Sequence, residues 1–497
     1  MSHRLSPTIE HVWVALLLAT VVATAGLLPL APWDFWWHAA VGREIVTTGA
    51  IPATDHFSYT ATGRPYHYQS WLSEIILYAA LAAGGPAGAI WLRVGVLLFI
   101  CGVLLSLSAE ASRGTLRLAA AVTGAGVAGT VTNWAVRPQL LSLPLFAVEL
   151  ALLWRWRGAV TGPRPIATPP PLWPLPLLLA LWANLHGAFV LGLGLPGLLW
   201  LGELLQQQRL TPPLRRLALW TGLATVAVAF NPRGLGIVGY VWTLLTDAPS
   251  QTFIVEWRPP TLATLEGRLF FTALAASAGL FVWQRRAFRI SDWLWFGAFA
   301  FLASRGIRYV IWFFLLLPPL LALALAAARK SGTGPPQLGT PKGSVVAVNA
   351  ALISAFALLA LLATPPFKAH LPLPPALRGL ATSDTPVAAV DILARRPPRH
   401  LFHDMGYGSY LIWRWRGSPP VFIDPRVELY PFALWQDYAT VVAADPGWQT
   451  VLDRWQVDTL LLDRRREAPL IAAAGAAGWH ERWHNAQTII FDRERPQ

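Results

Sequence analysis

An apolar segment followed at once by a polar, aromatic one decides the fold of this chain. Residues 11–30 read HVWVALLLATVVATAGLLPL, and residues 31–74 read APWDFWWHAAVGREIVTTGAIPATDHFSYTATGRPYHYQSWLSE. The first segment approaches the ~20 apolar residues that cross a bilayer. The second mixes acids and imidazoles with aromatic rings where a membrane anchor would need only a short loop, so it predicts a functional site at a membrane surface. Its polar residues are Asp34, His38, Asp55, His56, His67 and Glu74, and its rings include Trp33, Trp36, Trp37, Tyr59, Tyr66, Tyr68 and Trp71.

The composition describes a protein that lies mostly in lipid. Of the 497 residues, 55% are hydrophobic and only 13% are charged, which excludes an ordinary soluble domain. The single cysteine, Cys101, falls within an apolar run, so neither a disulfide framework nor a cysteine metal cluster is expected. A net charge of +13 is explained by arginines on cytoplasmic loops, so no nucleic-acid partner is expected. The preference for arginine over lysine, with abundant Ala, Pro and Gly, indicates a bacterial source.

Residues 1–363 are predicted to form about eleven transmembrane helices. The first run, Val12–Pro29, exceeds a signal-peptide core and lacks a clear cleavage site, so we interpret it as a retained span. Further apolar runs lie near residues 88–108, 117–133, 139–154, 172–184, 187–205, 216–230, 269–284, 291–303, 307–327 and 344–363.

Basic residues alternate across these helices. With a cytoplasmic N-terminus, every second connection carries arginines, as expected for a bacterial inner-membrane protein. This parity requires residues 71–84 to lie in the interface or to form a half-span without crossing, and it places the C-terminal part outside the cytoplasm. The remaining polar residues of the membrane part then all map to the outer face, which indicates a shared outward cavity. Beyond residues 34–74, they are Arg137, Asn184, His186, Asn231, Arg233, Glu256, Arg305 and Arg308.

The chain is predicted to end in a small extracytoplasmic α/β domain. A proline-rich connector covers residues 364–380, and residues 381–497 change to mixed helix and strand patterns. We expect a helix at 385–395 and strands near 399–403, 420–424, 458–463 and 488–492. The turns around Gly406, Gly408 and Asp424–Arg426 are interpreted as structural loops in preference to functional ones.

Three residues of the first loop are catalytic candidates. Asp34 and His38 are four residues apart and share one face of a helix that begins after Pro32, so His38 can orient the Asp34 carboxylate. Asp34 is the preferred base, and its alternative role is a helix cap. Asp55 follows in a turn, where it either binds substrate, with a divalent cation such as Mg²⁺ or Mn²⁺ as an option, or caps the next segment. No metal ligands are assigned.

Two further groups are predicted to bind ligands. Four arginines at outer helix ends suit a lipid phosphate, and their alternative is contact with membrane lipid phosphates: Arg305, Arg308, Arg137 and Arg233. Acceptor or sugar contacts are predicted for Trp37, His56, Tyr66, His67, Glu74, Asn184, His186 and Glu256. The alternatives here are intramembrane hydrogen bonds, the headgroup layer for Glu74 and local pairing with Arg258 for Glu256.

The order of these features resembles the GT-C superfamily of membrane glycosyltransferases, which includes oligosaccharyltransferases and protein mannosyltransferases. Members carry an acid just after the first span, in a long external loop with two interfacial helices, and WDFWWHAAVGREIVTTGAIPATDHF with PYHYQSWLSEIILYAAL occupies that place within residues 32–84. The resemblance implies that Asp34 is the base. A second acid is common beside the first in that family, whereas Phe35 and Trp36 follow here, which weakens any metal site.

Together, these features predict an integral membrane glycosyltransferase. It would transfer a sugar from a polyprenyl-phosphate-linked donor to an extracytoplasmic acceptor, by inverting displacement with Asp34 as base. The alternative is a glycolipid or polysaccharide transporter, in which the same cavity binds without chemistry, and a third possibility is an assembly protein whose external domain does the work. Polar groups gathered on one side favour the transferase, because a transporter would carry them on both.

Overall fold

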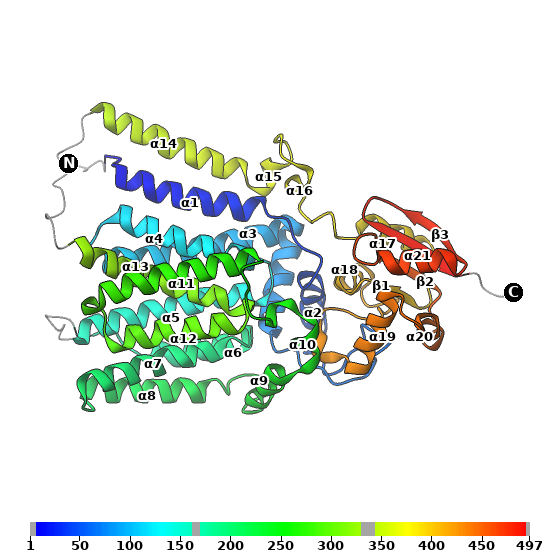
Figure 1. The fold of residues 1–497 in the computed structure, drawn as a ribbon, viewed down its shortest axis with the longest axis horizontal. Coiled ribbons are helices and arrows are strands. Elements are labelled where there is room, and N and C mark those ends of the chain that lie inside the picture. The colour runs from blue at the N-terminus through cyan, green and yellow to red at the C-terminus, as the bar shows by residue number, and fades with distance from the viewer. Residues whose placement is uncertain (1–5, 162–168, 330–342, 494–497) are drawn as a thin grey trace.

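The computed structural model describes residues 6–161, 169–329 and 343–493. Figure 1 shows an elongated molecule with a bundle of long helices at one end and a small α/β domain at the other. The bundle contains α1 (Ile9–Leu27), α3 (Trp71–Ala111), α4 (Leu116–Gly129), α5 (Pro138–Thr161), α6 (Pro174–Leu185), α7 (Phe189–Gln207), α8 (Pro212–Ala227), α11 (Leu265–Trp283), α12 (Ile290–Arg305), α13 (Val310–Arg329) and α14 (Gly343–Leu362).

Shorter elements connect the bundle to the domain. They are α2 (Phe35–Thr48), α9 (Gly236–Thr246), α10 (Ala248–Phe253), α15 (Pro365–Lys368) and α16 (Pro375–Arg378), with the 3₁₀ turns η1 (Val131–Asn133), η2 (Val255–Trp257), η3 (Arg285–Ala287) and η4 (Ile307–Tyr309). In Figure 1, α2 lies across the end of the bundle, between the long helices and the domain.

Every predicted apolar run coincides with a helix of the bundle. Within the described residues, six helices are long and apolar enough to cross a membrane, which marks a multi-pass membrane protein: Ile9–Leu27, Trp71–Ala111, Phe189–Gln207, Leu265–Trp283, Ile307–Arg329 and Ser344–Leu362. The other helices are shorter or less apolar by this measure, so the number of eleven crossings stays a prediction.

Helix α3 consists of two arms, as the predicted separation of residues 71–84 from the following span requires. The backbone leaves the helical conformation at Gly84 and Gly85, and Gly85 has a φ of 58°, which glycine adopts without steric cost. The arms also pack closely, because a Cβ on Gly88 would lie 2.1 Å from the carbonyl oxygen of Ala80. The first arm can therefore turn along the end of the bundle while the second runs through it.

Another glycine sets the distance between α2 and the first arm of α3. A Cβ on Gly42 would lie 2.0 Å from the carbonyl oxygen of Glu74, so only glycine permits this approach. The contact brings the His38 ring within hydrogen-bonding distance of the Glu74 carboxylate. Helix packing at Gly42 thus positions two of the predicted site residues.

The C-terminal domain is a four-stranded mixed sheet covered by helices. Its strand order is β1-β2-β4-β3, with β1 parallel to β2 and the other pairs antiparallel. The elements are α17 (Val387–Arg395), β1 (Leu401–His403), α18 (Met405–Trp415), η5 (Val427–Leu429), α19 (Phe432–Ala443), α20 (Trp448–Arg454), β2 (Thr459–Asp463), α21 (Ala468–Ala476), β3 (Trp479–His484) and β4 (Thr488–Arg493).

The predicted strands differ from this sheet in two places. Residues 420–424 do not join it, because Val421 exchanges backbone hydrogen bonds with Phe57 and Tyr59 of the first loop. Strand β3 was not predicted, since its sequence, WHERWH, is largely polar and exposed. The extended segment before Asp424 therefore ties the domain to the first loop.

The expected one-sided distribution of buried polar groups is wrong. Helix α5 starts at the domain end, so Arg157 lies at the opposite end, where it pairs with Asp292 at the start of α12. Glu203, near the C-terminal end of α7, pairs there with Arg289 at 2.6 Å. Glu149 is also fully buried in α5. The one-sidedness that favoured a transferase over a transporter is therefore absent, and the choice depends on the geometry at the end of the bundle that meets the C-terminal domain.

The Gly42→Ala substitution should loosen the contact between α2 and α3. The added methyl group must displace the Glu74 backbone, and overpacking of this kind costs about 1–3 kcal/mol. We expect a lower midpoint of thermal unfolding for the purified protein in detergent. Gly95→Ala in α3 is the matched control, because a Cβ there meets nothing within 4 Å. Equal midpoints for the two variants would contradict the close contact.

Candidate active site

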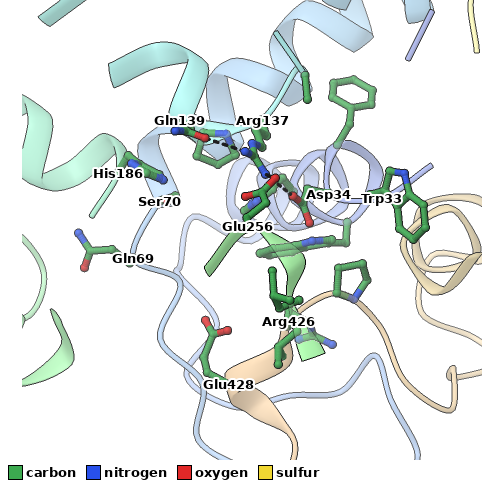
Figure 2. A pocket seen from close by; sticks show the side chains of 18 of the residues that line it. Trp33, Asp34, Gln69, Ser70, Arg137, Gln139, His186, Glu256, Arg426 and Glu428 are labelled. Carbon is green, nitrogen blue, oxygen red and sulfur yellow. Dashed lines mark hydrogen bonds and ion pairs between the residues drawn. The ribbon is translucent and has the colours of Figure 1, made fainter. Parts of the chain in front are cut away.

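A cavity of about 540 Å³ lies where the bundle, α2 and the C-terminal domain meet. Its walls come from distant parts of the chain: the first loop, the start of α5, the segment from α9 to η2, η4 and the loop after Asp424. Figure 2 shows polar side chains from these elements turned toward one another. A hollow with a few convergent polar groups is the usual form of a small-molecule site.

Asp34 stands directly before α2, at the position of the helix cap, but its side chain makes no capping hydrogen bond. The capping role considered from the sequence is therefore wrong. Its Oδ2 atom lies 3.5 Å from Nη1 of Arg137, and the side chain is 30% exposed within the cavity. Arg137 lies between two acids, since the same Nη1 is 2.8 Å from Oε1 of Glu256 (Figure 2). Gln139 accepts a further hydrogen bond from Arg137 at 2.7 Å.

The two acids beside Arg137 have opposite shifts in pKa. Burial raises the pKa of Asp34, and Glu256 adds to this effect, whereas the more distant Arg137 only partly offsets it. Burial also raises the pKa of Glu256, but its short contact with Arg137 lowers it more, so its net pKa is below the ordinary value. Paired carboxyl groups whose pKa values are pushed apart suit different tasks. Glu256 is suited to hold Arg137, and Asp34 to accept a proton.

His38 lies one helical turn after Asp34 and faces the first arm of α3. Its Nδ1 atom is 3.0 Å from Oε1 of Glu74. Burial lowers the pKa of His38 well below its ordinary value, and His186, Arg137 and Arg426 lower it further, so the ring is neutral near pH 7. A neutral His38 can fix the orientation of Glu74, whose second oxygen is buried with no hydrogen-bond partner among the described residues.

Asp55 forms part of a buried ion cluster beside the cavity. Its Oδ1 atom lies 2.8 Å from Nη1 of Arg426, and Asp424 binds Nη2 of the same guanidinium at 2.6 Å. Tyr68 accepts a hydrogen bond from this guanidinium at 3.1 Å. Burial lowers the pKa of Arg426, but Asp424 raises it more, so the guanidinium keeps its charge. The cluster joins the first loop to the C-terminal domain.

The cavity gathers ten of the predicted site residues. They are Asp34, His38, Trp37, Tyr66, His67, Glu74, Arg137, His186, Glu256 and Arg308. Five others do not line it: Asp55, His56, Asn184, Arg233 and Arg305.

The five outlying residues have other surroundings. His56 pairs with Glu44 at 3.0 Å. Asn184 accepts a hydrogen bond from the Trp71 indole at 2.8 Å. Nη2 of Arg233 lies 2.9 Å from Nε2 of His67, so Arg233 contacts a lining residue without lining the cavity itself. Arg305 ends α12, whereas Arg308 in η4 turns into the cavity.

Several lining residues were missed from the sequence. Arg93 is buried in α3 and donates to the carbonyl oxygen of Ala25 at 2.7 Å, and its signal was a lone arginine within an apolar run. Glu428 follows the turn that was interpreted as a structural loop, and it accepts a hydrogen bond from Tyr66 at 2.9 Å. Other lining residues that the sequence did not assign to the site include Tyr68, Gln69, Gln139, Tyr240, Trp257 and Arg426.

No group of three His, Cys, Asp or Glu side chains in the described residues comes together as a metal site would require. In the cavity the positive charge between the acids Asp34 and Glu256 belongs to the Arg137 guanidinium. The described residues of the cavity therefore offer no group of ligands for a divalent cation.

Comparison of folds decides the architecture. The structure matches the Archaeoglobus fulgidus oligosaccharyltransferase in its apo form with a TM-score of 0.53 and 12% identity, over 97% of this chain and 74% of that one. It matches ArnT from Cupriavidus metallidurans bound to undecaprenyl phosphate with a TM-score of 0.52 and 15% identity, over 96% and 97%. The chain has the GT-C fold.

A third GT-C structure holds a lipid phosphate too. AglB from Archaeoglobus fulgidus, in complex with an inhibitory peptide and a dolichol-phosphate, matches with a TM-score of 0.53 and 11% identity over 97% of this chain and 74% of that one. No protein-family model matches the sequence. No curated protein sequence matches it either. The likeness to GT-C proteins thus rests on the structure alone. Sequence identities of 11–15% to the matched structures establish a shared fold and nothing more.

The Asp55→Asn substitution should weaken the junction between the first loop and the C-terminal domain. It leaves the buried Arg426 with one carboxylate, and breaking a buried ion pair costs about 3–5 kcal/mol. We expect a lower thermal midpoint and faster proteolysis of the domain in the purified full-length protein. The control is Asp391→Asn, which removes an exposed ion pair with Arg414 and should change either measurement little. A similar loss in both variants would show that the buried cluster is dispensable.

Proposed function

We propose that this chain is an integral membrane glycosyltransferase that moves a sugar from a polyprenyl-phosphate-linked donor to an extracytoplasmic acceptor. The observation that carries the proposal is the uncapped Asp34 carboxylate, open to a cavity that also holds the Arg308 guanidinium, which forms no ion pair within the described part of the chain. Two solved structures with this fold, AglB and ArnT, hold dolichol-phosphate and undecaprenyl phosphate respectively, which supports the donor class. The proposed membrane is a bacterial inner membrane, with the N-terminus in the cytoplasm and the domain outside.

Arg308 is the proposed anchor for the donor phosphate. Its guanidinium stacks on the Trp257 ring at 4.0 Å and has no ion-pair partner among the described residues. Arg137, by contrast, is already neutralised by Asp34 and Glu256. A guanidinium held by an aromatic face and without a carboxylate is suited to bind phosphate oxygens.

The proposed reaction is a single displacement. Asp34 accepts the proton of an acceptor hydroxyl or amine as the acceptor atom bonds to the anomeric carbon of the sugar. The bond from that carbon to the phosphate oxygen breaks, and the polyprenyl phosphate leaves with the electron pair while Arg308 stabilises its charge. One displacement inverts the anomeric centre. Trp37, Tyr66, His67, His186 and Glu428 line the space that the sugar and the acceptor would occupy.

A transporter is the second candidate, favoured by the buried ion pairs at the opposite end of the bundle. Both pairs, Arg157 with Asp292 and Arg289 with Glu203, lie outside the cavity lining. A transporter needs no base, so the two functions differ in what they require of Asp34.

Asp34→Asn should abolish sugar transfer, because the amide cannot accept the proton. Lipid mass spectrometry would measure isoprenoid-linked sugars in membranes of a deletion strain that carries either wild-type protein or the variant. We expect one lipid-linked sugar to accumulate in the deletion strain and with Asp34→Asn, but not with wild type. Asp445→Asn, at an exposed acid of the C-terminal domain, is the control and should behave as wild type. A wild-type lipid profile with Asp34→Asn would favour the transporter.

Arg308→Ala should weaken binding of undecaprenyl phosphate to the purified protein by about tenfold or more, because a hydrogen bond to a charged group contributes about 1.5–3 kcal/mol. Arg305→Ala is the matched control, since it removes a neighbouring arginine outside the cavity lining. Equilibrium binding in detergent micelles measures both. An equal loss in the two variants would assign the effect to general surface charge and remove Arg308 from the phosphate site.

A further inference from the structure

The N-terminus of α2 receives its cap from another part of the chain. A residue in the position of Asp34 normally accepts a hydrogen bond from the second or third backbone N–H of its helix. Here the third N–H group, that of Trp37, donates to the hydroxyl oxygen of Ser409 at 2.9 Å. Ser409 is fully buried in α18 of the C-terminal domain, 372 residues away in the sequence. The hydroxyl supplies the cap that the Asp34 side chain does not, since Asp34 has helical backbone angles (φ −87°, ψ −36°) where a capping residue is normally extended.

Helix α18 also holds the residue before Asp34. A Cβ on Gly406 would lie 2.6 Å from the Trp33 ring, so glycine allows the indole to lie directly against the helix. Figure 2 shows Trp33 turned away from Arg137, toward the tan ribbon of this region. The Arg466 guanidinium lies 5.1 Å from the same ring and is fixed by Asp404 at 2.9 Å. The domain therefore contacts the chain on both sides of Asp34.

We propose that Ser409 is a positioning residue, whose hydroxyl caps α2 in place of Asp34 and so leaves the Asp34 carboxylate in the cavity. The part of this inference that concerns catalysis rests on the proposed function. Ser409 itself does not line the cavity and touches no proposed substrate.

Competition for one N–H group explains why the substitute cap matters. Without the serine hydroxyl, the buried Trp37 N–H would lack an acceptor, which is costly for a buried donor. Asp34 precedes the helix at the capping position, and its side chain reaches this N–H group once its ψ rotates from the helical to the extended region. Its carboxylate would then turn to the helix and away from Arg137 and Glu256, the charged groups that act on it in the cavity.

Hydrogen–deuterium exchange of the Trp37 amide tests whether Ser409 and Asp34 can replace each other as the cap of α2. The experiment uses full-length protein in phospholipid nanodiscs, with exchange followed by mass spectrometry of peptides that span residues 33–40. Asp34→Ala should leave the Trp37 amide protected, because Ser409 still caps it. Ser409→Ala should also leave it protected, because Asp34 takes over. The double variant should exchange about tenfold faster or more, since no acceptor remains.

Two further variants separate this role from a general effect on folding. Ser409→Cys keeps the packing volume but offers only a weak acceptor, so it should match Ser409→Ala and serves if the alanine variant does not fold. Thr459→Val removes a buried hydroxyl of the same domain that bonds to Asp458, and it should change nothing at Trp37. Rapid exchange in Ser409→Ala alone, or continued protection in the double variant, would overturn the proposal.

The effect of Ser409 on sugar transfer is measured from the isoprenoid-linked sugars of the deletion strain carrying each variant. Ser409→Ala should cause the lipid-linked sugar to accumulate, Ser409→Thr should restore the wild-type profile, and both proteins should bind undecaprenyl phosphate as wild type does. A wild-type profile with Ser409→Ala would remove the positioning role. The proposed function fails separately: if Asp34→Asn gives a wild-type profile while the exchange results hold, the substitute cap stands and Asp34 is not the base.

Discussion

The buried guanidinium of Arg426 is the interaction on which the rest of the site depends. It binds Asp424 of its own domain and Asp55 of the first loop, at 2.6 and 2.8 Å, with all three side chains out of contact with solvent. A charge buried in this way is stable only while its partners stay in place. The ion cluster therefore fixes the domain against the loop. Its neighbour Tyr68 extends the same network toward the cavity.

The cavity combines rigid and adaptable contacts. Gly42 brings α2 against the Glu74 backbone of the first arm of α3, and this close packing sets the spacing of His38 and Glu74. Arg137 then connects α5 to Asp34 and Glu256 through charge. Close packing thus holds one wall of the cavity and charge holds another. Of the two acids beside Arg137, Asp34 has the longer contact with the guanidinium.

The sequence predicted those features that depend on local patterns. Apolar runs located the helices, and the acid after the first span located Asp34, because both signals lie within a few neighbouring residues. Pairings between distant segments could not be predicted from the sequence. Asp55 was predicted to be a site acid because nothing in the sequence places Arg426 beside it. Likewise, nothing in the sequence indicates that Ser409 contacts the Trp37 amide. Arg308 lines the cavity and Arg305 does not, and this difference depends on the orientation of the short turn η4, which the sequence does not indicate. Paired charges at the far end were misjudged because their partners lie on different helices.

The separation of Trp37 from Ser409 has a consequence in time. At roughly 5–20 residues per second, tens of seconds of synthesis pass between the appearance of the first and the second. Throughout that interval the start of α2 lacks the Ser409 hydroxyl, so its N–H groups depend on Asp34 or on water. On the proposed role of Ser409, the Asp34 carboxylate is released into the cavity only after α18 has been synthesised and has packed against α2, so the order of synthesis sets the order in which the site is assembled.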